Sequence, residues 1–291
     1  MTRPPADIRI DEALVGRLVA AQVPDLMDQS IRIVASGWDN TIARIGQTWV
    51  ARLPRHEGAA ALIAHEQRWL PILARDLPLP VPVPTHVGLP TDEFPRPWSI
   101  GRWLPGSRAS ERPPTDERIA ADALARFLTA LHRPAPVDAP VNPLRGVALE
   151  RLTSAVDQRS AWLAGSIDRA RVLDIWHDGL RSPAWSHPPV WLHGDLHPAN
   201  LLTFEGRLSA VLDFGDLTSG DPAADLAIAW MTFAADAREH FRRGVGADAA
   251  TWRRAASWAL HFALAYCSSD EATGMPSIGR RALKAVLDES D

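Results

Sequence analysis

Two short polar motifs in the second half of the chain carry the residue types that phosphoryl transfer needs. They are HGDLHPAN at residues 193–200 and DFGD at residues 213–216. Asp195 and Asn200 lie five positions apart, and Asp213 follows Asn200 by thirteen. Magnesium prefers hard oxygen ligands and is bound through one or two carboxylates together with substrate phosphates. The spacing therefore predicts a site that holds Mg²⁺ and a nucleoside triphosphate beside a hydroxyl that is to be phosphorylated.

The elements predicted around these motifs position their side chains. Residues 190–192 form a short apolar strand that leads into the first motif, and residues 201–204 and 208–212 form a hairpin. Asn200 then lies just before the hairpin and Asp213 just after it, so both can reach one metal ion. Asp195 lies in the preceding loop, where its carboxylate can accept the proton of a substrate hydroxyl or orient that hydroxyl.

The remaining pattern predicts a strand-rich first third and a helix-rich remainder. Strands are predicted at 31–35, 41–45, 48–53, 85–89 and 98–104, and helices at 11–23 and 57–74. A proline-rich run at 77–84 predicts a stiff extended connector. After Pro105 and Gly106, helices are predicted at 115–132, 146–163, 168–180, 222–235, 249–267 and 277–287. We expect two lobes, residues 1–104 and 105–291, with a ligand cleft between them.

In both motifs the chain resembles the aminoglycoside phosphotransferase and choline kinase group, small-molecule relatives of the protein kinases. Protein kinases carry a related catalytic loop and a later Asp-Phe-Gly, and Gly194 before Asp195 is typical of the small-molecule enzymes. The resemblance covers nearly the whole chain. It implies an α+β, bilobal protein-kinase-like fold. The N-terminal nucleotide-binding lobe would have an antiparallel sheet plus helix, and a larger, mainly helical C-terminal lobe would carry the catalytic and substrate-binding residues.

The resemblance also implies a role for each motif residue. Asp195 would be the catalytic base, Asn200 and Asp213 would be ligands of Mg²⁺, and His193 would support the loop. His197 falls where protein kinases often have a lysine near the transferred phosphate, so it is expected to assist catalysis. The phosphoryl donor would be ATP or GTP, between which the sequence does not distinguish.

The nucleotide side departs from the commonest kinase pattern. Kinases usually hold the α- and β-phosphates with a strand lysine that pairs with a glutamate on the next helix. Here the strand at 49–53 carries Arg52 instead. Arginine keeps its charge and offers a planar fork for phosphate, so Arg52 is expected to take over this contact. Glu66 on the following helix is its expected partner, and Glu57 is the alternative.

Two further segments are expected to contact the nucleotide. The turn at 36–40 takes the place of the glycine-rich phosphate loop, so the backbone amides of Ser36 and Gly37 are expected to cradle a phosphate. The segment 99–103 lies at the lobe junction, where Ile100 and Arg102 are expected to supply backbone hydrogen bonds to a purine.

Two aspartates after the second motif are expected to have a structural role. Asp221 and Asp225 should cap a helix and complement its dipole. In the resembling family this segment supports the catalytic loop.

These residues predict a nucleoside-triphosphate-dependent O-phosphotransferase whose acceptor is an antibiotic of aminoglycoside or macrolide type. A housekeeping metabolite kinase of the same fold is the alternative. From another class, a catalytically silent nucleotide-binding module stays open, and so does a metal-dependent hydrolase in which alternating His193, Asp195 and His197 bind a metal directly. The acceptor pocket is expected below Asp195, with candidates on the late helices: Asp225, Trp230, Asp236, Glu239, Trp258, His261, Asp270 and Glu271.

Composition limits the other function classes. The net charge of −4 gives no general basic surface for nucleic acid. No stretch reaches the roughly 18 apolar residues that would span a bilayer. The single cysteine, Cys267, excludes an intrachain disulfide framework, and the first seven residues lack the apolar run of a signal peptide. We therefore expect a cytoplasmic protein, a monomer or weak dimer, whose partners are a nucleotide and a small-molecule hydroxyl compound.

Overall fold

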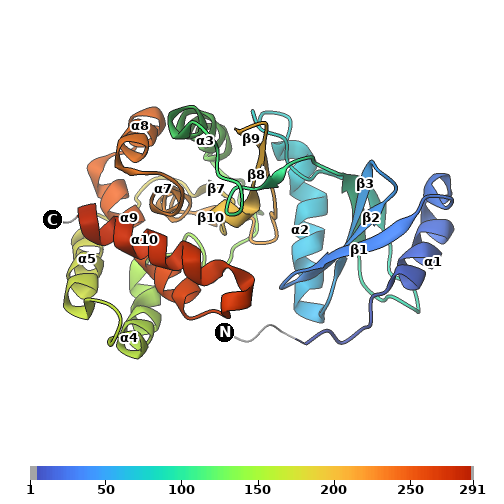
Figure 1. Ribbon diagram of the computed structural model, residues 1–291, viewed down its shortest axis with the longest axis horizontal. Coiled ribbons are helices and arrows are strands. Elements are labelled where there is room, and N and C mark those ends of the chain that lie inside the picture. Colours follow the sequence, from blue (N-terminus) through green and yellow to red (C-terminus); the bar gives the residue numbers. More distant parts are fainter. Residues whose placement is uncertain (1–4, 290–291) are drawn as a thin grey trace.

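The first part of the chain folds into a five-stranded antiparallel sheet flanked by two helices. The computed structural model describes residues 5–289. Residues 1–4, which belong to the N-terminal segment predicted to lack a signal peptide, lie outside the described part. In sheet order the strands are β1 (Ile31–Ser36), β2 (Asn40–Ile45), β3 (Trp49–Pro54), β5 (Trp98–Arg102) and β4 (Pro84–Gly88). Helix α1 (Glu12–Gln22) covers the outer face, and α2 (Glu57–Leu73) lies between the sheet and the rest of the molecule (Figure 1).

Local sequence explains how this sheet presents Arg52. Gly46 in the β2–β3 turn has a φ of 54°, a left-handed conformation that favours glycine. The hairpin register then pairs Arg52 with Ile42 on one side and with Ser99 on the other. Because side chains alternate across a strand, the neighbouring Ala51 and Leu53 point into the apolar core shared with α1. Arg52 points to the opposite face, toward α2.

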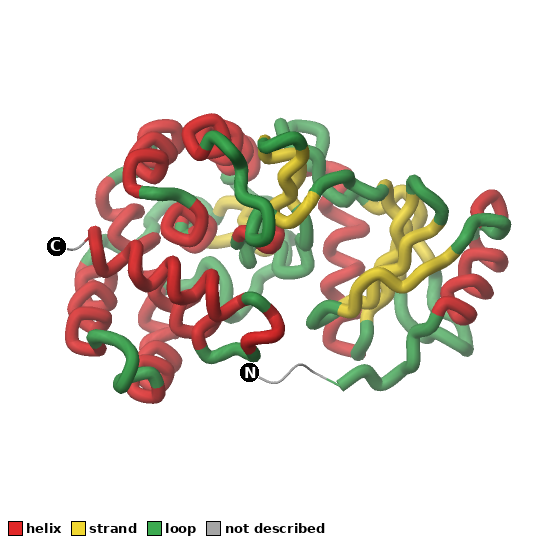
Figure 2. The backbone as a smooth tube through the Cα atoms, in the orientation of Figure 1, coloured by secondary structure: helices red, strands yellow, loops and turns green. Residues whose placement is uncertain are grey.

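The rest of the chain is mainly helical, with two small sheets facing the N-terminal part. Figure 2 shows the helices gathered around this half of the molecule. The small sheets pair β7 (Val190–Leu192) with β10 (Thr218–Gly220), and β8 (Leu201–Phe204) with β6 (Ser107–Arg108) and β9 (Arg207–Val211). The helices are α3 (Glu117–Leu131), α4 (Thr153–Trp162), α5 (Arg169–Arg181), α6 (Ala223–Leu226), α7 (Ile228–Thr232), α8 (Ala235–Val245), α9 (Ala249–Cys267) and α10 (Met275–Glu289).

A second apolar core unites these helices, and it includes part of α2. Fully buried Trp176, Phe214 and Trp258 lie in it together with Trp69 and Leu70 of α2. Helix α2 therefore packs on the helical part while its other side faces the sheet. The chain passes from the N-terminal part to the helical part between β5 and β6. The sequence predicts a lobe boundary at residue 104, within this connection, and that boundary stays a prediction. The antiparallel sheet with helix and the larger helical part confirm the predicted α+β, protein-kinase-like fold class.

The helix predictions were wrong in two places. The helix predicted at 146–163 begins at Thr153, after a 3₁₀ turn at Leu149–Leu152. The helix predicted at 222–235 is two short ones, α6 and α7, and a separate helix, α8, follows. Residues 223–233 are buried on every side, so their apolar pattern carries no helical period, whereas α8 is largely polar. Within residues 5–289, no helix has the length and apolar character to cross a membrane.

Candidate active site

The first motif forms a loop between β7 and β8 that is anchored from below by a buried carboxylate. Asp225 accepts hydrogen bonds from the backbone N–H groups of His193 at 2.8 Å and Gly194 at 2.9 Å, and lies 3.1 Å from Nε2 of His132. Burial alone would raise the pKa of Asp225, but these donors outweigh it and lower that pKa. The expectation that Asp225 caps a helix is therefore wrong. Its hydrogen bonds to the first motif agree with the expectation that its segment supports the catalytic loop.

Asp221 combines a local and a long-range contact. It accepts a hydrogen bond from the backbone N–H of Ala223 at 3.0 Å at the start of α6, as the capping prediction requires. Its carboxylate also lies 2.6 Å from Nε of Arg254 on α9. This buried pair ties the start of α6 to α9.

The loop turns tightly at Gly194, where the backbone conformation leaves no room for a side chain. Its φ is 85°, and an added Cβ would lie 2.3 Å from the carbonyl oxygen of Asp216. We expect Gly194→Ala to lower the free energy of unfolding by about 2 kcal/mol or more, because backbone strain adds to the clash. Urea denaturation measures this. Gly165→Ala is the control, since nothing lies within 4 Å of its added Cβ; equal losses in the two variants would contradict the argument.

His193 fixes the loop and is unavailable as a metal ligand. Its Nε2 donates to the carbonyl oxygen of Leu212 at 2.8 Å, and its Nδ1 accepts from the backbone N–H of Asp195 at 3.3 Å. Both ring nitrogens are therefore used within the protein. Among residues 5–289, no group of three or more His, Cys, Asp or Glu side chains is placed to hold a metal ion. The hydrolase alternative, which needs His193 as a ligand, loses its support.

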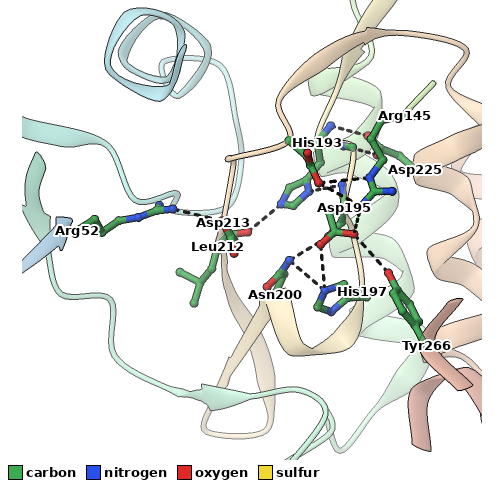
Figure 3. Close-up of polar contacts among 12 residues, drawn as sticks. Arg52, Arg145, His193, Asp195, His197, Asn200, Leu212, Asp213, Asp225 and Tyr266 are labelled. Carbon is green, nitrogen blue, oxygen red and sulfur yellow. Dashed lines mark hydrogen bonds and ion pairs between the residues drawn. The ribbon is translucent and has the colours of Figure 1, made fainter. Parts of the chain in front are cut away.

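Asp195 lies at the centre of a polar cluster (Figure 3). Its Oδ1 is 3.2 Å from Nη2 of Arg145 and 3.4 Å from the hydroxyl of Tyr266, and its Oδ2 is 3.4 Å from Nε2 of His197. Burial alone would raise the pKa of this carboxyl, but Arg145 and His197 outweigh burial and hold the pKa well below its usual range. Asp195 is therefore ionised at neutral pH and can accept a hydrogen bond from a hydroxyl.

Asn200 and Asp213 flank Asp195 on the side that faces α2. Nδ2 of Asn200 donates to the backbone carbonyl of Asp195 at 2.9 Å and lies 3.3 Å from Nε2 of His197. Because the amide nitrogen makes these contacts, the amide oxygen is left for another partner. The side chain of Asp213 is 55% exposed. A carboxylate and an amide oxygen are hard donors that fit Mg²⁺.

In the structure, the predicted pair Arg52 and Glu66 lies together, and Arg52 also contacts Asp213 of the second motif. Nη2 of Arg52 lies 2.9 Å from Oε1 of Glu66 and 3.2 Å from Oδ1 of Asp213. Glu66 is 1% exposed, and burial raises its pKa to about 7 although Arg52 opposes the rise. The other predicted partner, Glu57, is exposed and lies 3.6 Å from Nε of Arg96 instead.

The remaining predicted nucleotide contacts lie in the N-terminal sheet. Gly37 closes the β1–β2 turn, since its N–H donates to the carbonyl of Asn40 at 2.8 Å, and Ser36 ends β1 beside it. Ile100 is buried in the middle of β5 and pairs with β3 and β4 on its two sides. Arg102 ends β5, and its guanidinium lies 4.0 Å from the ring centroid of Trp49.

Sequence reasoning missed Arg145, Asp216 and Tyr266 around Asp195. Nε of Arg145 lies 3.3 Å from Oδ2 of Asp216, so this arginine bridges Asp195 and Asp216. Asn142 donates to the other oxygen of Asp216 at 2.7 Å. Asp216 belongs to the second motif, which could have marked it. Arg145 and Tyr266 lie outside both motifs, and no local pattern distinguishes them.

Comparison with known proteins decides the family. A profile described as the phosphotransferase enzyme family matches residues 30–258. The chain belongs to this phosphotransferase enzyme family. This membership confirms the predicted resemblance and the predicted enzyme class, a phosphotransferase with an alcohol group as acceptor. No curated protein sequence matches the chain significantly.

Solved structures share the fold of this phosphotransferase at low sequence identity. The GDP complex of aminoglycoside 2'-phosphotransferase-IIIa is 19% identical with a TM-score of 0.72, and the match covers 97% of this chain and 100% of that one. Macrolide 2'-phosphotransferase MphH from Brachybacterium faecium is 22% identical with a TM-score of 0.61, covering 95% and 97%. The streptomycin–ATP ternary complex of APH(2")-IIa is 18% identical with a TM-score of 0.60, covering 90% and 93%.

Most of the predicted acceptor residues on the late helices of this phosphotransferase are buried in the core or paired with other side chains. Trp230 and Trp258 are buried in the core, and His261 is nearly so. Asp236 pairs with Arg118, and Glu271 pairs with Arg280. The others are Asp225 in the loop anchor, Asp270 at the start of the 3₁₀ turn Glu271–Thr273, and exposed Glu239.

Proposed function

We propose that this phosphotransferase moves the γ-phosphoryl group of ATP or GTP to a hydroxyl of a small molecule, with Asp195 as the group that receives the hydroxyl proton. The observation that carries this proposal is that an ionised Asp195 lies between two groups of side chains of different character. On one side lie Asn200, Asp213 and Arg52, and on the other lie Arg145 and Tyr266 (Figure 3). Glu66 pairs with Arg52 on the first side. The first side suits a triphosphate and the second an acceptor.

The step then uses the groups of this chain in named roles. The acceptor oxygen forms a bond to the γ-phosphorus, the bond from that phosphorus to the β–γ bridging oxygen breaks, and the hydroxyl proton passes to Asp195. The transition state is loose, so the oxygen needs little deprotonation beforehand, and the low pKa of Asp195 does not prevent its role. Asp195 first orients the hydroxyl and takes the proton as the new bond forms. His197, 3.4 Å away, restrains the carboxylate.

The donor side supplies positive charge. Arg52 would leave Asp213 to contact the α- and β-phosphates while Glu66 keeps holding it. Asn200 and Asp213 would hold Mg²⁺, which when bound neutralises negative charge on the phosphates. The turn at Ser36 and Gly37 would lie over the phosphates. Binding of GDP and of ATP by proteins of similar fold supports a nucleotide donor.

Two acceptor classes remain, and a different observation supports each. Proteins of similar fold are named as aminoglycoside and macrolide phosphotransferases, which supports an antibiotic acceptor. A metabolite acceptor is the second candidate. The side chains that contact the carboxylate of Asp195 on the acceptor side are an arginine and a tyrosine, and the neighbouring Asp216 is paired with that arginine. A polycationic aminoglycoside would need carboxylates that are not already paired.

Nucleotide binding tests the donor half of the proposal. We expect Mg²⁺-dependent binding of ATP or GTP in calorimetry, weakened at least about tenfold by Arg52→Gln, because a charge-assisted phosphate contact is lost. Arg52→Lys should recover part of the affinity since it keeps the charge. Arg32→Gln, on the exposed edge strand β1, is the matched control and should bind as the wild type does. Absence of any Mg²⁺-dependent nucleotide binding by the wild type would refute the proposed function.

The acceptor half is tested by mass spectrometry. Incubation with the bound nucleotide and a panel of aminoglycosides, macrolides and hydroxylated metabolites should add one phosphoryl group, about 80 daltons, to a single class. Drug susceptibility of cells that express the protein then separates an antibiotic acceptor from a metabolite. Nucleotide binding without transfer to any compound of a broad panel would favour the catalytically silent module.

A further inference from the structure

The acceptor side of Asp195 is lined by aromatic rings along one face of α9. Trp258, Phe262 and Tyr266 are spaced four residues apart, so they share a helix face. The rings of Phe262 and Tyr266 stack at 5.9 Å, and those of Trp258 and Phe262 lie 5.4 Å apart. The row begins at Asp195, to which the Tyr266 hydroxyl donates. All three side chains are buried, so they form a floor beneath other groups.

One arginine lies over this floor, and a second lies on a helix that packs against α9. The guanidinium carbon of Arg145 is 5.3 Å from the ring centroid of Phe262, and its side chain is 22% exposed. Arg159 lies on α4, which packs against α9, and it is half-buried. Burial lowers the pKa of the Arg159 guanidinium, and the charge of Arg145 lowers it further. The group over the aromatic floor is therefore cationic, and the neighbouring helix α4 carries a second cation.

Around α9, three buried nitrogen atoms have no hydrogen-bond partner among the described residues. Nη1 of Arg159, Nε1 of Trp258 and Nδ1 of His261 are all buried and make no hydrogen bond to the residues of the described range 5–289. His261 is 5% exposed and its ring lies 5.7 Å from both Trp258 and Phe262. Burial, with Arg159 and Arg145, lowers the pKa of His261 to about 3, so its ring is neutral and can donate one hydrogen bond. Unmet buried donors are rare in native proteins.

Carboxylates do not balance the charge of Arg159. Arg145 is paired with Asp195 and Asp216, but Arg159 forms no ion pair with any described residue. The acidic candidates of the late helices have other partners, as Asp236 and Glu271 do. An anionic ligand requires such surroundings: an arginine without an ion-pair partner, and polar atoms without a hydrogen-bond partner.

We infer that the acceptor carries an anionic group, such as a carboxylate, which binds between Arg159 and Arg145 above the α9 rings while its hydroxyl reaches Asp195. The inference rests on the proposed phosphotransfer function and narrows its acceptor. It favours a hydroxy acid with a flat or apolar body over a polycation. Arg159 and His261 supply the donors that hold the anionic end, and Phe262 and Tyr266 support the body.

Three matched probes test the inference. They are 3-(hydroxymethyl)benzoate, 3-(hydroxymethyl)benzamide and 3-(hydroxymethyl)benzylamine, which share ring and hydroxyl and differ in charge. Each is titrated by NMR into the full-length protein saturated with Mg²⁺ and a non-hydrolysable analogue of the nucleotide that binds. We expect the benzoate to bind at least about tenfold more tightly than the benzylamine, the ratio that one charge-assisted contact supplies.

Variants assign the preference to Arg159. Arg159→Gln should weaken benzoate binding about tenfold and leave benzamide binding within about twofold, because only the charged contact is removed. Arg159→Lys should retain the preference for the benzoate. Arg151→Gln, an exposed arginine close by in the chain, is the control and should bind as the wild type does. Circular dichroism shows that each variant is folded.

The outcomes separate this inference from the proposed function. If the benzylamine binds as tightly as the benzoate, or if neither binds while the nucleotide does, the inference is wrong and the phosphotransfer proposal stands. A benzoate preference that survives Arg159→Gln also overturns it. If no Mg²⁺-dependent nucleotide binding occurs, the proposed function itself is wrong.

Discussion

Asp195→Asn should lower kcat about a thousandfold while nucleotide affinity stays within about twofold of the wild type. The amide can still accept a hydrogen bond from the acceptor hydroxyl and can still lie near Arg145 and Tyr266, so binding survives. It cannot take up the proton that the hydroxyl loses when the new bond to phosphorus forms. Steady-state kinetics with the acceptor found in the mass-spectrometric screen gives kcat, and calorimetry gives the nucleotide affinity.

Asp178→Asn is the matched control for this substitution. Asp178 is an exposed aspartate near the end of α5 whose carboxylate lies 3.6 Å from Arg181, so its loss should leave kcat unchanged. If Asp195→Asn keeps more than about a tenth of the wild-type kcat, Asp195 is not the group that receives the proton. If it loses nucleotide binding to the same extent as turnover, Asp195 acts on the donor side instead.

Asp225→Asn should lower the free energy of unfolding by about 3 kcal/mol and also abolish most activity. The carboxylate accepts from two backbone N–H groups, of His193 and Gly194, and contacts His132. An amide at this buried position presents an N–H₂ group to one of those donors, which then loses its acceptor. Urea denaturation at pH 7 measures the loss, and Asp236→Asn, at an exposed aspartate 4.0 Å from Arg118, is the control.

The same anchor gives a pH dependence with a defined sign. The pKa of Asp225 is lower in the folded protein than its ordinary value, so its contribution to stability is complete above the unfolded pKa of about 3.9. That contribution is lost as pH falls through the folded pKa. The difference in unfolding free energy between wild type and Asp225→Asn should therefore shrink in acid. A difference that stays constant from neutral pH to below the ordinary pKa would contradict the role of an ionised carboxylate.

The parts of the site that lie close together in sequence could be predicted. Asp195, Asn200 and Asp213 are separated by one loop and one hairpin, so their spacing in the chain nearly determines their spacing in the fold. Arg52 and Glu66 are joined by a strand and the next helix, and this local unit is also repeated in the family that the motifs resemble. Helix α9 was predicted with its observed bounds, Ala249–Cys267, although residues 257–264 are all buried and show no alternation of buried and exposed positions.

Other parts depend on contacts between distant segments, which the sequence does not reveal. Asp225 looked like a helix cap, because an aspartate early in a helix usually is one. Its carboxylate is instead turned toward a loop thirty residues earlier by the packing of α6 and α7 in the core. Arg145 lies in a loop without a motif, fifty positions before Asp195, and its pairing with that residue arises only when the loop closes over the site.

The sequence by itself determined how the motif residues lie on the side proposed to bind the phosphoryl donor, since covalent spacing and local hydrogen bonds position them. It determined the fold class for the same reason, through periodic patterns and short connections. Only the tertiary structure decided what surrounds the acceptor side of Asp195. Acidic and aromatic residues of the late helices looked equivalent in sequence. Helix packing paired the carboxylates of Asp236 and Glu271 with arginines and left Arg145 over the ring of Phe262. The charge of an acceptor pocket is a sum over distant segments, and only folding brings those segments together.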